Sequence, residues 1–108
     1  MIGFDLVEIK RFKNFKKTDS FVQKTFSRNE ITYCFGFKDA ATHLAGTFAG
    51  KEAAVKALGA NGVSVYDIEV RRNKNSQPEV WMNNKKILDI SISITHTDKI
   101  AGSIVLAN

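Results

Sequence analysis

Residues 48 to 59 read Phe48-Ala49-Gly50-Lys51-Glu52-Ala53-Ala54-Val55-Lys56-Ala57-Leu58-Gly59. This stretch is the second half of a long helical pattern, which Asp39 can cap at its start and Gly59 can end. Glu52 and Lys56 are four residues apart and therefore share one face of the helix, whereas Lys51 lies about 100° away from Glu52. The helix thus presents a carboxylate and two lysines among small residues.

Two interpretations of these charges remain open on spacing alone. Glu52 and Lys56 can form an exposed ion pair worth about 0.2–0.5 kcal/mol. The small residues around them instead favour close packing against another part of the molecule. Asp5 is unusual in the same way, because a carboxylate in the apolar segment 2–7 is costly unless it is paired, binds a metal or caps a helix. Two carboxylates, one from a strand end and one from a helix, suit Mg²⁺.

The remaining pattern predicts one α+β domain over residues 1–108, with helices in the first half packed on a mainly antiparallel sheet from the second half. Glycines four apart, Gly46 and Gly50, predict that another backbone or a ligand packs closely on the long helix. The Ser27–Glu30 spacing is that of a capping box. The expected elements are a strand in 2–9, an amphipathic helix at 11–17, a short helix or turn anchored by Phe21 and Phe26, helices at 28–36 and 40–58, a loop at 59–62, and strands at 66–72, 79–82, 90–95 and 99–106.

Composition narrows the class of protein. The chain has 108 residues, a formal charge of +5 and one cysteine, Cys34. No apolar run approaches the ~20 residues of a membrane span, and no signal peptide is expected at the N-terminus. Cys34 lies among aromatic residues and is expected to be a packed thiol in a reducing compartment, the cytoplasm. A domain of this size builds deep clefts with difficulty, so we expect a homo-oligomer.

Basic residues are concentrated between Lys10 and Lys17, which predicts an acidic partner. One alternative is a nucleic-acid-binding module that uses Phe12, Phe15 and the neighbouring lysines. That alternative leaves Asp5 and Glu52 without a role, and no recognised nucleic-acid-binding motif supports it. We therefore expect no nucleic acid partner.

Three stretches, in order, resemble the holo-acyl-carrier-protein synthase family of 4′-phosphopantetheinyl transferases. They are Ile2-Gly3-Phe4-Asp5-Leu6-Val7-Glu8-Ile9 followed by Arg11-Phe12, the helix Phe48 to Gly59, and Ile92-Ser93-Ile94-Thr95-His96-Thr97 with the following Ala101 to Leu106. Together they cover nearly the whole chain. The resemblance implies a transferase that moves 4′-phosphopantetheine from coenzyme A to a serine of an apo acyl carrier protein.

The resemblance also implies roles for individual residues. Asp5 and Glu52 match the Mg²⁺ ligands, and Glu52 and Lys56 match the catalytic residues. Coenzyme A is expected to contact Lys51, His96 and Thr97, and the carrier protein to dock on Arg11, Phe15 and Lys17. A homotrimer with sites between neighbouring subunits is implied as well. A non-catalytic relative that still binds coenzyme A or the carrier is a further alternative.

The chain departs from the family pattern at basic positions. Thr47 stands where the family usually has arginine, Gln77 where a lysine precedes Pro78, and the loop at 59–62 lacks the usual glycine-threonine-glycine. Two of these changes remove positive charge expected near the phosphates. We therefore expect weaker coenzyme A binding than is usual, unless Lys51, Lys74 or another lysine substitutes.

Overall fold

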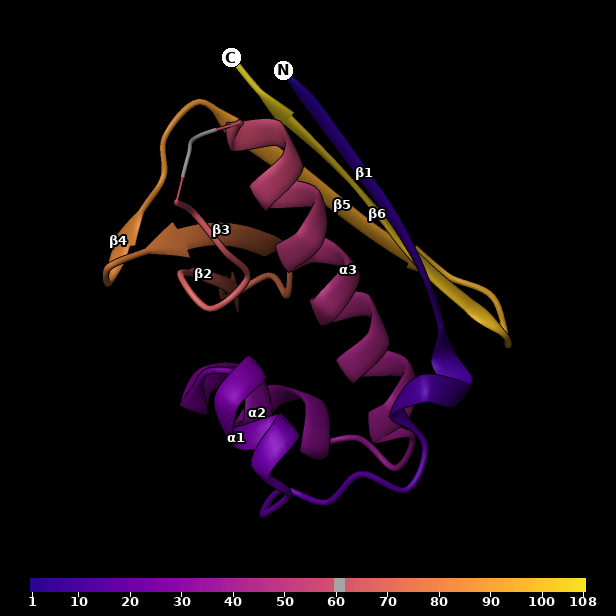
Figure 1. Cartoon of the computed structure of the whole chain (residues 1–108). Coiled ribbons are helices and arrows are strands. Elements are labelled where there is room, and N and C mark those ends of the chain that lie inside the picture. The colour runs from indigo at the N-terminus through magenta and orange to yellow at the C-terminus, as the bar shows by residue number, and fades with distance from the viewer. Residues whose placement is uncertain (60–61) are drawn as a thin grey trace.

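Helix α3 (Ala40–Leu58) runs through the centre of the computed structural model, which describes residues 1–59 and 62–108 (Figure 1). The Asp39 side chain accepts a hydrogen bond from the Thr42 amide at the start of the helix, and Gly59 ends it with a φ of 60°. Both ends are as predicted. The predicted loop at 59–62 lies partly outside the described residues.

Two antiparallel three-stranded sheets pack against α3. The first has the order β1-β6-β5 and the second the order β2-β3-β4. The strands are β1 (Ile2–Glu8), β2 (Ile68–Arg72), β3 (Pro78–Met82), β4 (Lys85–Lys86), β5 (Ile90–His96) and β6 (Ile100–Ala107). The α+β class is confirmed, although the single expected sheet is divided in two. The division follows β4, which was not predicted, where Asp89 takes a φ of 59° before the chain enters β5.

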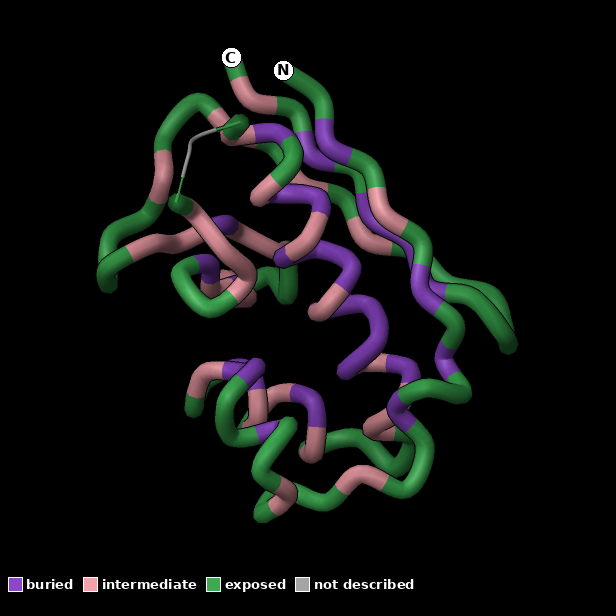
Figure 2. The backbone as a smooth tube through the Cα atoms, viewed as in Figure 1, coloured by how far each residue is buried: buried purple, intermediate pink, exposed green. Residues whose placement is uncertain are grey.

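Strand alternation places one face of the first sheet against α3. Figure 2 shows exposed residues alternating with buried or half-buried ones along β1, and in the second half of β6. Close packing at Gly46 and Gly50 is found, but it comes from side chains and not from the predicted backbone or ligand, because a Cβ atom there would lie 3.0 Å from Ile94 Cγ2 and 3.2 Å from Ile92 Cδ1. Small helix residues therefore let β5 lie directly on α3.

The first half of the chain forms a layer of short helices at one end of α3 (Figure 1). These are the 3₁₀ helix η1 (Ile9–Phe12), α1 (Ser20–Thr25) and α2 (Arg28–Phe35). The Ser27–Glu30 capping box at the start of α2 is confirmed. Among the described residues, we find no helix with the length and apolar character needed to cross a membrane.

The predicted helix at 11–17 is wrong. The chain leaves helical geometry after Phe12, and Asn14 adopts a φ of 71°, which interrupts any helix. Phe12 is buried, and Phe15 stacks on Phe21 of α1 with ring centroids 5.1 Å apart. Aromatic packing between segments, which a helical period does not reveal, sets the local conformation.

Candidate active site

Asp5 lies inside β1 on the face that packs against α3. Its Oδ1 atom is 3.2 Å from Lys56 Nζ, and the same ammonium donates a hydrogen bond to the carbonyl oxygen of Phe4 at 2.9 Å. The Asp5 side chain is 16% exposed and that of Lys56 is 53% exposed. Asp5 therefore caps no helix, and Lys56 pairs with Asp5 instead of forming the alternative pair with Glu52.

The register between β1 and α3 brings Asp5 to the level of Glu52. A Cβ atom on Gly3 would lie 1.8 Å from the carbonyl oxygen of Ala53 and 2.7 Å from the amide nitrogen of Ala57, so Gly3 faces that turn. Two strand residues advance about 6.6 Å, which corresponds to about four to five residues of helix at about 1.5 Å each. Asp5, two residues beyond Gly3 on the same face, thus lies beside the preceding turn of α3, which contains Glu52.

The Glu52 side chain is half-buried. Within the described part of the chain, no hydrogen bond or ion pair involves its carboxylate. Asp5, Glu52 and Lys56 thus form a small surface, here called the carboxylate half-site, with two hard oxygen donors and one ammonium. Residues 1–59 and 62–108 contain no group of three or more His, Cys, Asp or Glu side chains arranged for a metal.

Two carboxylates are nonetheless a donor set that fits Mg²⁺. This ion usually takes one or two protein carboxylates and completes its octahedron with water and phosphate oxygens. The unpaired Glu52 carboxylate and the partly exposed Asp5 carboxylate meet that requirement. The half-site can therefore hold a metal that also contacts a phosphate group.

Lys51 does not lie on this surface, although it precedes Glu52 in sequence. Its Nζ atom donates hydrogen bonds of 2.7 Å to Glu30 Oε1 and to the carbonyl oxygen of Thr25, and the residue is 2% exposed. The ammonium is thus bound inside the protein, between α3 and the α1–α2 layer. As placed, Lys51 cannot contact coenzyme A at the surface, so the expected contact is not supported.

His96 and Thr97 lie at the β5–β6 hairpin. The Thr97 hydroxyl accepts hydrogen bonds from the Lys99 and Ile100 amides, which holds the turn. His96 is exposed, and its Nδ1 atom lies 3.1 Å from the carbonyl oxygen of Thr97. Its ring lines a pocket of about 190 Å³ with Arg72 and His43. We call His43, Arg72 and His96 the histidine half-site.

The two half-sites lie on opposite flanks of α3. The carboxylate half-site is on the β1 side, whereas the histidine half-site is on the β5 side, with β6 between these strands. Two strand spacings separate β1 from β5 by about 10 Å. No residue of the carboxylate half-site lines the pocket that contains His96. A single chain therefore does not unite the predicted site residues in one cleft.

Of the three predicted docking residues, Arg11 lies near the carboxylate half-site, and Phe15 and Lys17 follow it in sequence. The Arg11 guanidinium lies 5.6 Å from the ring centroid of Phe48, which is one helical turn before Glu52. Lys17 is exposed, and Phe15 is half-buried in its stack with Phe21. We call Lys10–Lys17 the basic segment. Its Arg11 lies against Phe48, on the side of α3 that carries Glu52 one turn later.

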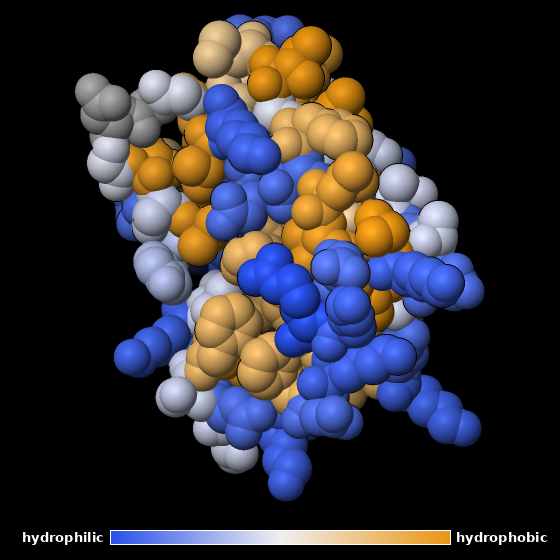
Figure 3. Space-filling model, turned by 45° about the vertical axis from the view of Figure 1, so that its right-hand side comes forward, coloured by the Kyte–Doolittle hydropathy of each residue, from blue (hydrophilic) through white to orange (hydrophobic). Residues whose placement is uncertain are grey.

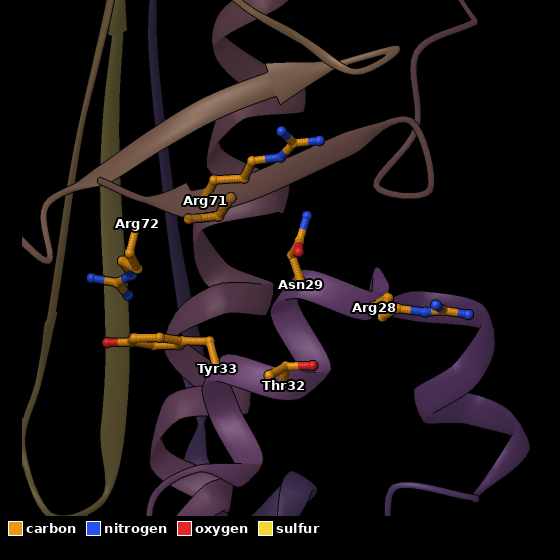
Figure 4. Close-up of a pocket in the computed structure, with 7 residues that line it drawn as sticks. Arg28, Asn29, Thr32, Tyr33, Arg71 and Arg72 are labelled. Carbon is orange, nitrogen blue, oxygen red and sulfur yellow. The ribbon is translucent and has the colours of Figure 1, made fainter. Parts of the chain in front are cut away.

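Arg72, His43 and Tyr33 were not predicted as site residues from the sequence. Figure 4 shows the Arg72 guanidinium over the Tyr33 ring, with Arg71 directed the other way. Tyr33, Arg71 and Arg72 line a second pocket of about 460 Å³ with Arg28, Asn29 and Thr32. The available signal was the pair Arg71-Arg72 at the end of a strand, because successive strand residues point to opposite faces.

Comparison with known proteins shows the family of the chain. The family model of the 4′-phosphopantetheinyl transferase superfamily matches residues 1–107. The holo-[acyl-carrier-protein] synthase of Caldicellulosiruptor saccharolyticus is 36% identical, covering 98% of this chain and 94% of the relative. That of Thermodesulfovibrio yellowstonii is 39% identical, covering 97% and 95%.

Solved structures give the same result. The holo-[acyl-carrier-protein] synthase of Helicobacter pylori, crystallised with coenzyme A, superposes with a TM-score of 0.80 at 30% identity over 100% of both chains. The synthase of Bacillus anthracis, in complex with coenzyme A (3′,5′-ADP), gives a TM-score of 0.77 at 33% identity, covering 96% of this chain and 91% of that one. The chain therefore belongs to the 4′-phosphopantetheinyl transferase superfamily and, within it, to the holo-[acyl-carrier-protein] synthase family of enzymes.

Proposed function

We propose that this enzyme transfers 4′-phosphopantetheine from coenzyme A to a serine hydroxyl of an apo acyl carrier protein and releases adenosine 3′,5′-bisphosphate. The contact between β1 and α3, which places Asp5, Glu52 and Lys56 on one surface, is the observation that carries this proposal. Relatives that are named synthases favour it over the nucleic-acid-binding alternative.

Asp5 and Glu52 would hold Mg²⁺ against the pyrophosphate of coenzyme A. When bound, the ion neutralises charge on the phosphate oxygens, which is the main requirement of phosphoryl transfer. Lys56 is oriented toward the same place by its bonds to Asp5 and Phe4, and it offsets the negative charge that develops on the leaving oxygen. The half-buried Glu52 carboxylate can accept the proton of the attacking serine.

The test is a transfer assay read by mass spectrometry. Wild-type protein, coenzyme A, Mg²⁺ and an apo carrier should give a carrier heavier by one phosphopantetheine. Glu52→Gln should abolish this shift while the fold is retained, and chelation of Mg²⁺ should do the same. Glu8→Gln is the matched control, because Glu8 is an exposed carboxylate of β1 that pairs with Lys10. A Glu52→Gln variant that still binds coenzyme A and turns over normally would refute the proposal.

We also propose that the enzyme is a homotrimer whose sites form between subunits. This is supported by the separation of the half-sites and by an apolar outer face on the first sheet. Phe4 faces Ile104, and Ile2 faces Leu106, across the β1–β6 pair. All four, with Leu6, are between 46% and 64% exposed. Figure 3 shows hydrophobic side chains gathered over the upper part of this side of the molecule.

Light scattering after size-exclusion chromatography tests the assembly. Ile104→Lys should convert a trimer to monomers, because a lysine would be buried without a partner in the apolar interface. Leu88→Lys, on an exposed leucine outside this face, is the control and should leave the trimer intact. A wild-type protein that is monomeric at all concentrations would contradict the proposed assembly.

The basic segment is the proposed docking surface for the acidic carrier. Arg11 and Lys17 supply exposed cations, and the Phe15–Phe21 stack supplies an apolar contact. Charge attraction of this kind acts mainly on the association rate and weakens with salt. Arg11→Glu should therefore raise the KM for the carrier without changing the affinity for coenzyme A.

We place the reaction in the cytoplasm, since the sole cysteine, Cys34, is a buried thiol typical of reducing compartments.

A further inference from the structure

The pocket of the histidine half-site combines three cationic or potentially cationic groups with polar side chains. It encloses about 190 Å³, and its wall includes Tyr33, Thr42, His43, Arg72 and His96. No aspartate or glutamate lines it. Its floor is formed partly by Gly46, where a Cβ atom would crowd Ile94. This composition is suited to an anion, since donors surround the space and acceptor charges do not.

Arg72 is the strongest donor in this pocket. Its guanidinium carbon lies 4.7 Å from the centroid of the Tyr33 ring, so the charged group rests over an aromatic surface (Figure 4). Across the described residues, Arg72 forms no ion pair and no side-chain hydrogen bond. A positioned guanidinium with free donors is the group that best binds phosphate oxygens in pairs.

The adjacent Arg71 provides a direct contrast. Its Nε atom donates to Glu69 Oε1 at 2.6 Å, and its guanidinium lies 4.0 Å from the Trp81 ring centroid. Arg71 is thus neutralised within the second sheet and does not line the histidine half-site. The two arginines carry the same charge one residue apart, but only Arg72 is available to a ligand in this pocket.

The pKa of His43 is affected by the positive charges around the pocket. Its ring stacks on Phe37 with centroids 3.7 Å apart, and burial together with the charges of Arg72 and His96 holds its pKa below the ordinary value. The charge of Asp39 acts on His43 in the opposite direction, but Asp39 does not line the pocket and accepts hydrogen bonds from Thr42 at the start of α3. An anion bound beside Arg72 would therefore meet a pocket wall without a carboxylate.

Arg72 lies near position 47, where this chain has threonine and the family usually has arginine. Thr47 is 2% exposed, and its hydroxyl lies 3.4 Å from the thiol of Cys34, the residue after Tyr33. An arginine at position 47 would have to displace this packing. Arg72 reaches the same part of α2 from β2 and rests on Tyr33. The guanidinium is thus supplied from a strand rather than from α3.

We propose that Arg72 binds a phosphate group of coenzyme A and replaces the arginine that the family usually carries at position 47. This inference rests on the proposed function, because it names a contact for the same substrate. His43 and His96 line the same space and assist through their ring nitrogens. The expected weak binding of coenzyme A is then offset by a residue that the sequence pattern does not mark.

Isothermal titration of the intact enzyme with coenzyme A tests the proposal. Arg72→Gln should raise the Kd about 10-fold to 100-fold, the range for losing hydrogen bonds to a charged group. Arg72→Lys keeps the charge but loses the fork, and should fall between wild type and Arg72→Gln. Arg71→Gln is the matched control and should change the Kd less than about threefold. Thermal unfolding of each variant separates loss of binding from loss of fold.

Two shorter ligands identify which phosphate is bound. If Arg72 contacts the 3′-phosphate, Arg72→Gln and wild type bind dephospho-coenzyme A equally, while the loss persists with adenosine 3′,5′-bisphosphate. If it contacts the pyrophosphate, the loss persists with dephospho-coenzyme A. In wild-type protein, either contact should shift the NMR signals of Arg72 Nε–H and of the His43 ring when coenzyme A is added. That readout needs no variant to fold.

Equal affinity of folded Arg72→Gln and wild type for coenzyme A would overturn the inference and leave the proposed function standing. An equal loss in Arg71→Gln would overturn it as well, because general charge would then explain the effect. A wild-type enzyme that does not bind coenzyme A would overturn the proposed function and this inference with it. Weakened binding in Arg72→Gln alone, with the intermediate value in Arg72→Lys, would support it.

Discussion

The ammonium of Lys51 lies 2.7 Å from Glu30 Oε1 in the interior, with side chains 2% and 0% exposed. Glu30 Oε2 also accepts a hydrogen bond from the Val70 amide at 2.7 Å, so this pair joins α2, α3 and β2. Burial raises the pKa of Glu30, whereas Lys51 and the amide donors act against that rise. Because Lys51 and Glu52 are about 100° apart on α3, fixing one inward directs the other toward β1.

Lys51→Met should lower the free energy of unfolding by about 3–5 kcal/mol, because Glu30 would remain as a buried charge without its partner. Urea denaturation monitored by circular dichroism measures this loss. The double variant Lys51→Met with Glu30→Gln should recover part of it, since the uncompensated charge is removed. A loss below about 1 kcal/mol in the single variant would show that the pair contributes no more than an exposed one.

Lys56→Met should affect catalysis and leave stability almost unchanged, unlike Lys51→Met. Lys56 is half exposed, and its pair with Asp5 is worth at most about 1 kcal/mol, so stability should barely change. If Lys56 offsets charge on the leaving oxygen, kcat should fall about 100-fold to 1000-fold. Steady-state transfer kinetics beside urea denaturation check both effects. Unchanged kcat in a folded variant would remove Lys56 from the catalytic residues.

Gly3→Ala should destabilise the protein by at least about 1–3 kcal/mol, since its Cβ atom would lie 1.8 Å from the backbone oxygen of Ala53. Gly102→Ala is the control, because its nearest neighbour is the flexible tip of the exposed Leu6, 2.9 Å away, which can move. Comparing the two thermal unfolding midpoints tests the argument. Equal midpoints would mean that β1 can shift away from α3.

Cys34 should be inert to thiol reagents in the folded enzyme. Burial raises its pKa from 9.0 to about 11, so the reactive thiolate is almost absent at pH 8. Unfolding should expose it, and labelling in urea compared with buffer measures the difference.

The raised pKa of Cys34 also makes stability depend on pH. The protonated thiol contributes about 2–3 kcal/mol to the free energy of unfolding, which is fully present below about pH 9 and is lost as the pH rises toward 11. Cys34→Ala should lack this alkaline loss, and rapid labelling of native protein would contradict the assignment.

Local signals in the sequence predict much of this fold. The Ser27–Glu30 capping box and the Asp39 and Gly59 ends of α3 are short-range features, and the structure has each of them. Strict alternation likewise predicts β5. The helix expected at 11–17 was wrong, because contacts between Phe12, Phe15 and distant aromatic rings determine that segment.

The candidate site was predictable where residues adjacent in a motif also share a surface. Glu52 and Lys56 lie on one face of α3, as their spacing requires. The direction of Lys51 was not predictable, since it depends on Glu30, twenty-one residues earlier in the chain. Arg72 was missed for a similar reason, because its availability follows from where Glu69 and Tyr33 lie in space.

The position of α3 between the two half-sites has a consequence for mixtures of chains. If sites form between copies, a Glu52→Gln chain still contributes an intact histidine half-site, and an Arg72→Gln chain an intact carboxylate half-site. Co-folding the two variants should rebuild some complete sites. Glu52→Gln alone should be inactive, and Arg72→Gln alone should be inactive at low coenzyme A concentrations, at which the mixture should then regain activity. The smallest working unit of this enzyme would then be two neighbouring chains that share one reaction.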